Sequence, residues 1–186
     1  MTLAQIMTLA LRQLDEDLPD IAQYADLFRV YANEGYQIAV RTYLKPKATT
    51  TLHTDSEGSA YIGGMRLGRI VQIFDMESRP VWFALSLDGE AVSTLLHGAD
   101  LTVIHEPPAP MLETDQDIPQ LPDDVHHALA DSICYRHLAN GNMAKQSRAQ
   151  HYLAAFHQAM RSVTPQGAGS VTRMKNLYEA TDIRRR

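Results

Sequence analysis

The chain has 186 residues, 45% of them hydrophobic, which is enough to build one hydrophobic core. Its formal charge of -5 is unevenly distributed, because residues 164–186 carry five basic and two acidic residues and leave the rest of the chain near -8. An acidic body argues against general nucleic-acid binding, which needs a basic surface, and the single cysteine excludes an internal disulfide.

The first predicted element is a helix near the start of the chain. Thr2, followed three residues later by Gln5, has the form of a capping box. Apolar residues then recur at helical spacing, which predicts that one face of this helix is buried. They are Leu3, Ile6, Met7, Ala10, Leu11 and Leu14.

A second, longer helix is predicted after Pro19 and Asp20, which together form a helix-start signal. It should end near Lys45, because the residue before a proline avoids the helical region. The spacing of its aromatic residues is that of packing side chains, not of a stacking or cofactor site. The residues expected to face inward are Ile21, Tyr24, Ala25, Phe28, Ala32, Gly35 and Ala39.

Between residues 47 and 106, the spacing of the apolar residues changes from that of a helix to that of extended strands. Short runs of β-branched and aromatic residues are separated by turn formers such as DSEG, ESRP and HGAD. Links this short allow antiparallel hairpins but not the crossover helices that parallel strands need, so a small meander or barrel-like sheet is predicted. The expected strands are 49–54, 60–62, 67–74, 81–87 and 101–105.

An acidic, proline-rich linker at 107–121 leads into two further helices. We expect its acidic residues to belong to a solvent-exposed linker and to the start of the next helix. The alternative is that they line a passage for DNA. Pro122 suits the first turn of the third helix, where Val125, Leu129 and Ile133 face one way. Residues 140–142 (NGN) form a tight connector to a fourth helix, whose apolar face is Tyr152, Ala155, Phe156, Ala159, Met160 and Val163.

Together these patterns predict an α+β protein. Helices within 2–44 and 122–163 form a four-helix body, and 47–106 form an inserted small antiparallel β-sheet. We take 1–163 as one domain and 164–186 as an extended C-terminal tail.

The tail has few apolar residues and no regular period, so it should be disordered on its own. Ordering about 20 residues costs roughly 20–40 kcal/mol of backbone entropy, which contacts within this chain hardly offset. We therefore predict that the tail folds against a partner through apolar anchors flanked by basic residues. The predicted docking residues are Arg173, Met174, Lys175, Leu177, Tyr178, Arg184, Arg185 and Arg186.

Catalytic and metal-binding patterns are weak. His127 and Asp131, one helical turn apart, are the best ligand pair, but there is no HExxH and no second cysteine, and zinc needs three or four converging ligands. Cys134 lies in the middle of a predicted helix among apolar residues, which predicts a buried, unreactive thiol. We expect no enzymatic activity, no cofactor and no metal.

The layout of residues 1–163 resembles the head-to-tail connector, or adaptor, proteins of tailed bacteriophages. The resemblance lies in the paired N-terminal helices, the β insertion, and the passage LTVIHEPPAPMLETDQDIPQLPDDVHHAL that leads into a helix pair broken at 140–142. It implies a structural virion protein in the phage neck, assembled in the host cytoplasm. The implied partners are copies of itself in a dodecameric ring, the portal protein, which the tail would contact, and a downstream tail or nozzle protein.

The resemblance further implies a ring whose channel passes genomic DNA without sequence-specific binding. Two alternatives stay open: a small metal-dependent hydrolase using His127 and Asp131, and a DNA-binding regulator using the basic C-terminus at 184–186. No secretory signal pattern opens the sequence and no apolar run reaches about 18 residues, so we expect no membrane association.

Overall fold

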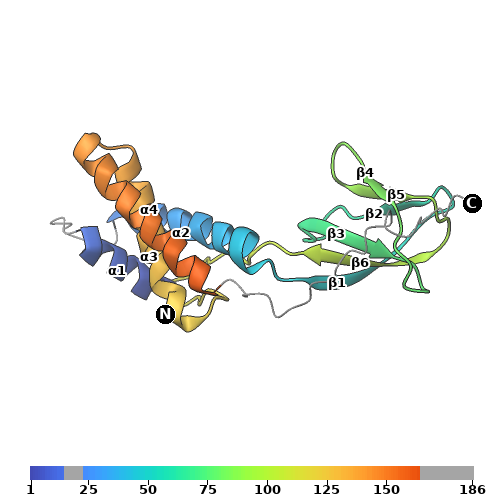
Figure 1. The fold of residues 1–186 in the computed structure, drawn as a ribbon, viewed down its shortest axis with the longest axis horizontal. Helices are drawn as coiled ribbons and strands as arrows, with labels where there is room; N and C mark the ends of the chain where they lie inside the picture. Colours follow the sequence, from blue (N-terminus) through green and yellow to red (C-terminus); the bar gives the residue numbers. More distant parts are fainter. Residues whose placement is uncertain (15–22, 164–186) are drawn as a thin grey trace, which may run out of the picture.

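A computed structural model describes residues 1–14 and 23–163. The molecule is elongated, with a helical body at one end and a β module at the other (Figure 1). The start signal at Pro19 and the inward position of Ile21 lie outside the described residues. The predicted α+β class with four helices and antiparallel strands is confirmed. Among the described residues, no helix is both long and apolar enough to cross a membrane.

The helical body is built around one central helix. Helix α3 (His126–Ala139) packs against α1 (Leu3–Leu14), α2 (Ala25–Ile38) and α4 (Met143–Val163). The sequence predicted a single buried face for α3, but most of its residues are buried because helices cover it on several sides. A π-helical segment (Ala39–Leu44) continues α2, and a 3-10 turn (Asp123–Val125) precedes α3.

The predicted helix ends are confirmed at several points. The backbone N–H of Thr2 donates to Gln5 Oε1 at 2.9 Å and the N–H of Gln5 donates to Thr2 Oγ1 at 3.4 Å, so the capping box forms. After the π-helical segment, Lys45 adopts a left-handed conformation with φ of 44° and Pro46 follows. Asn142 Oδ1 accepts the backbone N–H of Lys145 at 3.0 Å and begins α4.

The β module consists of two three-stranded antiparallel sheets, with strand orders β1-β6-β3 and β2-β5-β4. The two strands of each consecutive pair lie in different sheets. These pairs are β1 and β2, β3 and β4, and β5 and β6. The sequence predicted a small antiparallel meander or barrel-like sheet; the strands are antiparallel as predicted, but their order within each sheet is not that of a meander. The strands are β1 (Ala48–His53), β2 (Ser59–Tyr61), β3 (Arg69–Phe74), β4 (Phe83–Leu85), β5 (Ala91–Thr94) and β6 (Asp100–Glu106).

Two of the turns in this module use the same hydrogen-bond pattern. Asp55 Oδ1 accepts the N–H groups of Glu57 and Ser59 at 2.8 and 2.9 Å, and these bonds hold the pKa of Asp55 below its usual value. Asp75 Oδ1 accepts the N–H groups two and four residues later at 3.0 and 2.8 Å. The repeated aspartate turn therefore fixes how the chain passes from one sheet to the other.

The helical body and the β module have separate hydrophobic cores. The body core contains residues of all four helices, whereas the module core is a second cluster around Ile73, Val92, Leu101 and Val103. The link between them is formed on one side by 45–47 and on the other by Pro107 and Pro108, which follow β6. Each part therefore buries its own apolar side chains.

Gly68, just before β3, is a position where the β module should not tolerate a side chain. Its φ is +62°, and a Cβ there would lie 2.2 Å from the carbonyl oxygen of Glu106. Gly64 has φ of +79° but no atom within 4 Å of its Cβ position. We expect Gly64→Ala to cost about 1–2 kcal/mol for the left-handed backbone, and Gly68→Ala about 1–3 kcal/mol more for the clash. Hydrogen exchange of the β-strand amides measures both losses, and equal losses would contradict this account.

Candidate interaction surfaces

The predicted docking residues of the tail, from Arg173 to Arg186, lie outside the described residues. The structure therefore brings none of them to a described surface, and their role stays a prediction. The candidate sites that can be placed are the histidines, Cys134, the linker at 107–121 and the surfaces of the two parts.

The His127–Asp131 pair lies on α3 with the two side chains in different environments. His127 is exposed, whereas Asp131 is buried and accepts a hydrogen bond from Gln13 Nε2 at 3.2 Å. Burial raises the pKa of Asp131 above its usual value, against the lowering effects of Gln13 and His127. Within residues 1–14 and 23–163, no group of three or more His, Cys, Asp or Glu side chains is placed to hold a metal ion.

Cys134 is fully buried between α3 and α1. Its Sγ lies 3.5 Å from the carbonyl oxygen of Ala10 and 3.3 Å from Gln13 Oε1. Burial, together with the nearby charge of Asp131, raises the thiol pKa to about 12. The thiol therefore stays protonated at neutral pH, and it is a packing group of the helical body.

Residues 107–122 form a packed strap along α1 and α2, and this corrects the expectation of a solvated linker. Ala109, Leu112 and Leu121 of the strap are buried in the core of the helical body. The carboxylates of the strap are largely exposed, as expected, but the backbone that carries them is held against the body. A segment with both acidic and apolar residues can be an exposed linker or a strap packed on the body, so the sequence did not distinguish these two structures.

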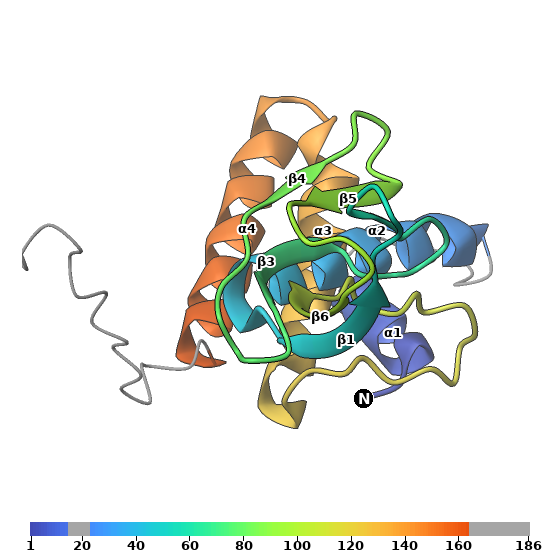
Figure 2. The same ribbon diagram turned by 90° about the vertical axis from the view of Figure 1, so that its right-hand side faces the viewer.

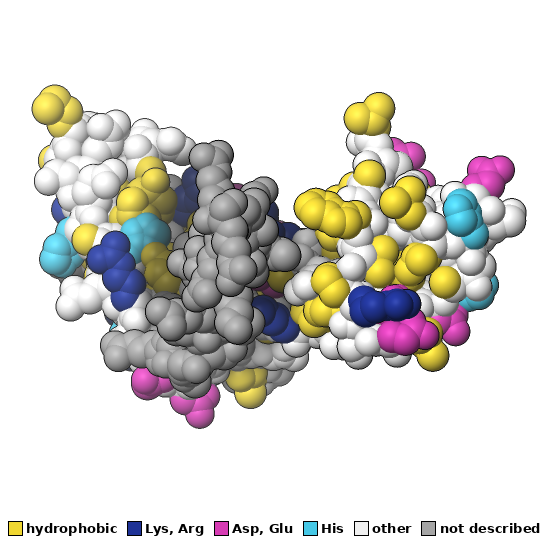
Figure 3. Space-filling model, turned by 45° about the vertical axis from the view of Figure 1, so that its right-hand side comes forward, with side chains coloured by type: hydrophobic (Ala, Val, Ile, Leu, Met, Phe, Trp, Pro, Cys, Tyr) yellow, Lys and Arg dark blue, Asp and Glu magenta, His cyan; other side chains and the backbone are white. Residues whose placement is uncertain are grey.

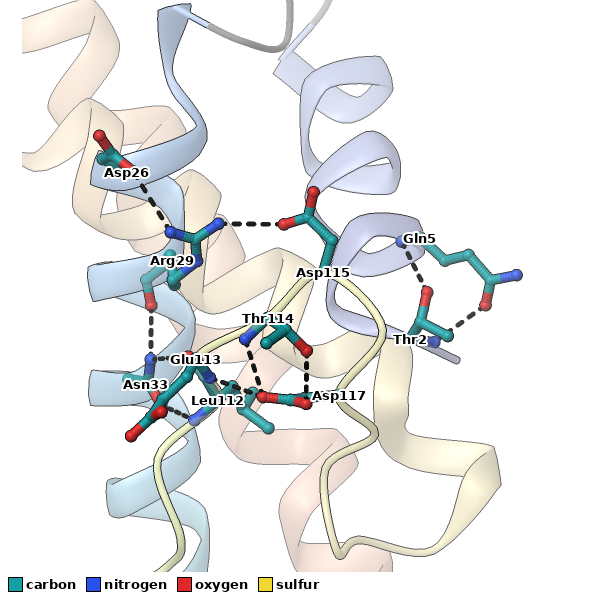
Figure 4. A network of polar contacts seen from close by, with 10 residues as sticks. All are labelled: Thr2, Gln5, Asp26, Arg29, Asn33, Leu112, Glu113, Thr114, Asp115 and Asp117. Atoms are coloured by element: carbon teal, nitrogen blue, oxygen red, sulfur yellow. Dashed lines mark hydrogen bonds and ion pairs between the residues drawn. The ribbon is translucent and has the colours of Figure 1, made fainter.

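Side chains of α2 hold the strap in place (Figure 4). Asn33 donates through Nδ2 to the carbonyl oxygen of Leu112 at 3.0 Å and accepts the N–H of Leu112 through Oδ1 at 2.8 Å. Gln37 Nε2 donates to the carbonyl oxygen of Ala109 at 2.8 Å. Arg29 bridges Asp26 at 3.3 Å and Asp115 at 3.0 Å. The sequence did not predict these bonds between α2 and the strap, because the residues that form them lie far apart in the chain.

The strap also completes the start of α1. The carbonyl oxygens of Asp117 and Asp115 accept the N–H groups of Leu3 and Ala4 at 2.8 and 3.0 Å, which are donors that have no partner inside the helix. The Asp117 carboxylate accepts the hydroxyl and N–H of Thr114 at 2.6 and 2.9 Å. These bonds hold the pKa of Asp117 below its usual value, so this carboxylate is ionised at neutral pH.

An apolar groove of about 470 Å³ lies between α2 and the strap. Val30 and Met111 form its exposed apolar part, each about half exposed. Glu34 and Glu113 are among its lining residues, and the Asn33 and Gln37 side chains that bond to the strap form part of its wall. Its lining residues are Arg29, Val30, Asn33, Glu34, Gln37, Met111, Leu112 and Glu113.

Helix α4 forms the opposite side of the helical body from the strap, as Figure 2 shows. Only Ala149, Phe156 and Met160 of its 21 residues are buried. The helix contains Lys145, Arg148 and Arg161 but no acidic residue. These basic side chains do not share one face, because Arg148 Nη2 donates to the carbonyl oxygen of Leu14 on α1 at 3.1 Å.

The β module exposes many large apolar side chains. Trp82 is 89% exposed, Leu87 is fully exposed, and Figure 3 shows apolar side chains gathered on one face of the module. Exposed apolar area of this kind marks surfaces that bind other molecules. The exposed large apolar residues of the module are Tyr61, Met65, Val71, Met76, Trp82, Leu85, Leu87 and Leu95.

No protein-family model matches the chain, and no curated protein matches it either.

Proposed function

We propose that this protein is a structural, non-enzymatic adaptor that joins a phage portal to its tail. Copies of the chain form a ring, the tail at 164–186 docks onto the portal, and the β module contacts the next tail component. The DNA passes through the central channel without sequence-specific contacts.

The observation that carries this proposal is the β module. It has its own core, it projects from the helical body, and it presents apolar side chains that its own fold leaves uncovered (Figures 1 and 3). A folded module with an uncovered apolar face needs a partner, and an enzyme does not need this arrangement for its chemistry. This supports a role in assembly.

The charge of the chain is consistent with a passage for DNA. Outside the tail the chain carries a charge near -8, and an acidic channel wall repels phosphates, whereas a basic groove would hold them. DNA can slide past such a wall. The same charge disfavours the alternative of a DNA-binding regulator, which would depend on the few basic residues at 184–186.

The β module provides the test of this function. In phage carrying Trp82→Ala with Leu87→Ala, we expect adaptor rings on DNA-filled heads that lack the downstream tail component, because the apolar contact is lost. Both side chains are exposed, so the fold should be unaffected. Negative-stain electron microscopy of the particles gives the result.

Glu90→Ala is the matched control, since Glu90 is an exposed residue between β4 and β5 in the same module. Particles of this variant should carry complete tails. Complete tails on particles of the double variant would remove the support that the β module gives to the proposed function.

A further inference from the structure

We propose that an extended segment of the downstream tail component binds along strand β1 and adds a fourth strand to the sheet β1-β6-β3. The segment carries apolar side chains on one face and hydroxyl or basic side chains on the other. This inference rests on the proposed function and identifies the edge of the β module at which the chain of the next component is held.

Strand β1 lies at the edge of its sheet, where only β6 pairs with it (Figure 1). Just beyond β1, the N–H of Thr54 donates to the carbonyl oxygen of Ala99 at 2.9 Å, and the register of β1 with β6 has no shift. Because hydrogen-bonded pairs alternate along an antiparallel ladder, the backbone groups of Thr49, Thr51 and His53 are directed away from β6. Within residues 1–14 and 23–163, no backbone group bonds to them from the open side.

The other edges of the two sheets are protected against an added strand. Strand β3 has a register shift between Ile70 and Gln72, and beyond it the N–H of Val81 donates to the carbonyl oxygen of Ile73 at 2.9 Å. Strands β2 and β4 have only three residues each. Proteins protect sheet edges with short strands, bulges, prolines and charged side chains. Strand β1 has six residues, no bulge, no proline and no Asp, Glu, Lys or Arg, so it is open to pairing.

The side chains of β1 indicate what the incoming segment carries. Thr49 and Thr51 are exposed on one face of the strand, whereas Ala48, Thr50 and Leu52 lie on the face toward the module core, in which Leu52 is buried. An added strand places alternate side chains beside these two rows. Apolar residues fit the core face because they extend the module core, and hydroxyl side chains fit beside the exposed threonines.

The charge of the module favours a segment of another protein over a second copy of this module. Residues 48–106 contain three basic and eight acidic residues, which gives a net charge of -5. Pairing of β1 with β1 of another copy would bring two such modules together, whereas a segment with Lys or Arg on its exposed face would be attracted. A pair of β1 strands is also closed after two copies and does not build a ring.

Thr51→Pro in the full-length chain tests this inference. Proline removes the outward N–H of residue 51 and leaves the ladder with β6 intact, because an edge position whose N–H faces solvent accepts proline. Phage with this variant should form adaptor rings on DNA-filled heads, with complete tails at least about tenfold rarer than in the wild type. Thr51→Ala is the matched control, since it removes the same side chain but keeps the N–H, and its particles should carry complete tails. Thermal unfolding of both purified variants checks the fold.

Hydrogen exchange of the wild-type protein is a second measurement that needs no substitution. In the isolated full-length chain, the amides of Thr50 and Leu52 should be protected by β6, whereas those of Thr49, Thr51 and His53 should exchange freely. In assembled tails, a strand paired with the open edge should slow exchange at the latter three amides by about tenfold or more. The amides of Thr50 and Leu52 are the internal control and should stay protected in both states.

Complete tails on Thr51→Pro particles, equal tail loss in Thr51→Ala, or unchanged exchange at the outward amides in assembled tails would each overturn the inference. The adaptor function would then still rest on the Trp82 and Leu87 test. Protection of these amides in the isolated chain would place a segment of this chain, from residues 164–186 or from a second copy, on β1 and would also overturn the inference. Particles that contain no copy of the chain would refute the adaptor function, and this inference with it.

Discussion

Phe156→Ala is expected to lower the free energy of unfolding of the helical body by about 3–5 kcal/mol, since truncation of a buried aromatic loses transfer energy and leaves a cavity. Phe156 is 1% exposed and lies in the body core on α4, next to the central helix α3. The β module has a separate core and should keep its structure. Chemical denaturation followed by circular dichroism at the helical band measures the loss, and hydrogen exchange reports on the β strands.

Tyr178→Ala is the control for this prediction, because Tyr178 belongs to the tail and not to the body core. We expect it to change the unfolding free energy by no more than about 0.5 kcal/mol, as for a surface substitution. Equal losses for the two variants would place the tail within the core and contradict the proposed division at residue 163. Simultaneous loss of the β module in Phe156→Ala would contradict the separation of the two cores.

Deletion of residues 164–186 is expected to abolish binding to the portal while leaving a folded, soluble body. The segment lacks the apolar content to order itself, but its basic and apolar residues suit docking onto a partner. Phage carrying the deletion should give DNA-filled heads without tails. Pull-down with purified portal and electron microscopy of the particles measure the two effects.

A full-length variant tests whether the apolar side chains of the tail, and not only its length, are needed for portal binding. Replacing Met174, Leu177 and Tyr178 by alanine keeps the tail and its charges, and we expect it to lose most of the portal affinity. Normal portal binding by the truncated chain would refute the tail hypothesis. Resistance of the tail to protease in the isolated monomer would also refute it, because the hypothesis has the tail order only on the portal.

The helical elements were predictable because their signals are local. The capping box at Thr2, the stop at Lys45 and Pro46, and the connector at 140–142 each depend on residues within a few positions of one another. The inward positions of Phe28, Ala32 and Ala39 followed from helical spacing and are confirmed. Such patterns need no knowledge of the rest of the fold.

The strap and the central position of α3 depend on contacts between distant segments. Asn33 meets Leu112 across 79 positions in the sequence, so nothing near Asn33 indicates that it is buried and bonded. Helix α3 has apolar residues and polar ones on every side, and only the placement of the other helices decides which are covered. A local pattern does not contain that information.

Strand β5 was missed for a related reason. Ala91–Thr94 is short, contains alanine and serine, and lies between two turn sequences, so its composition is typical of a loop. It forms a strand because it lies between β2 and β4, which supply hydrogen bonds on both sides. The non-sequential strand order likewise follows from pairing between distant strands, which composition does not specify.

Electron microscopy of the full-length protein bound to purified portal tests the adaptor proposal most directly. The proposed function predicts end-on views with a ring of adaptor copies around an open channel, and side views in which the β modules point away from the portal. A single copy on the portal, a ring with a closed centre, or the absence of any complex would contradict it.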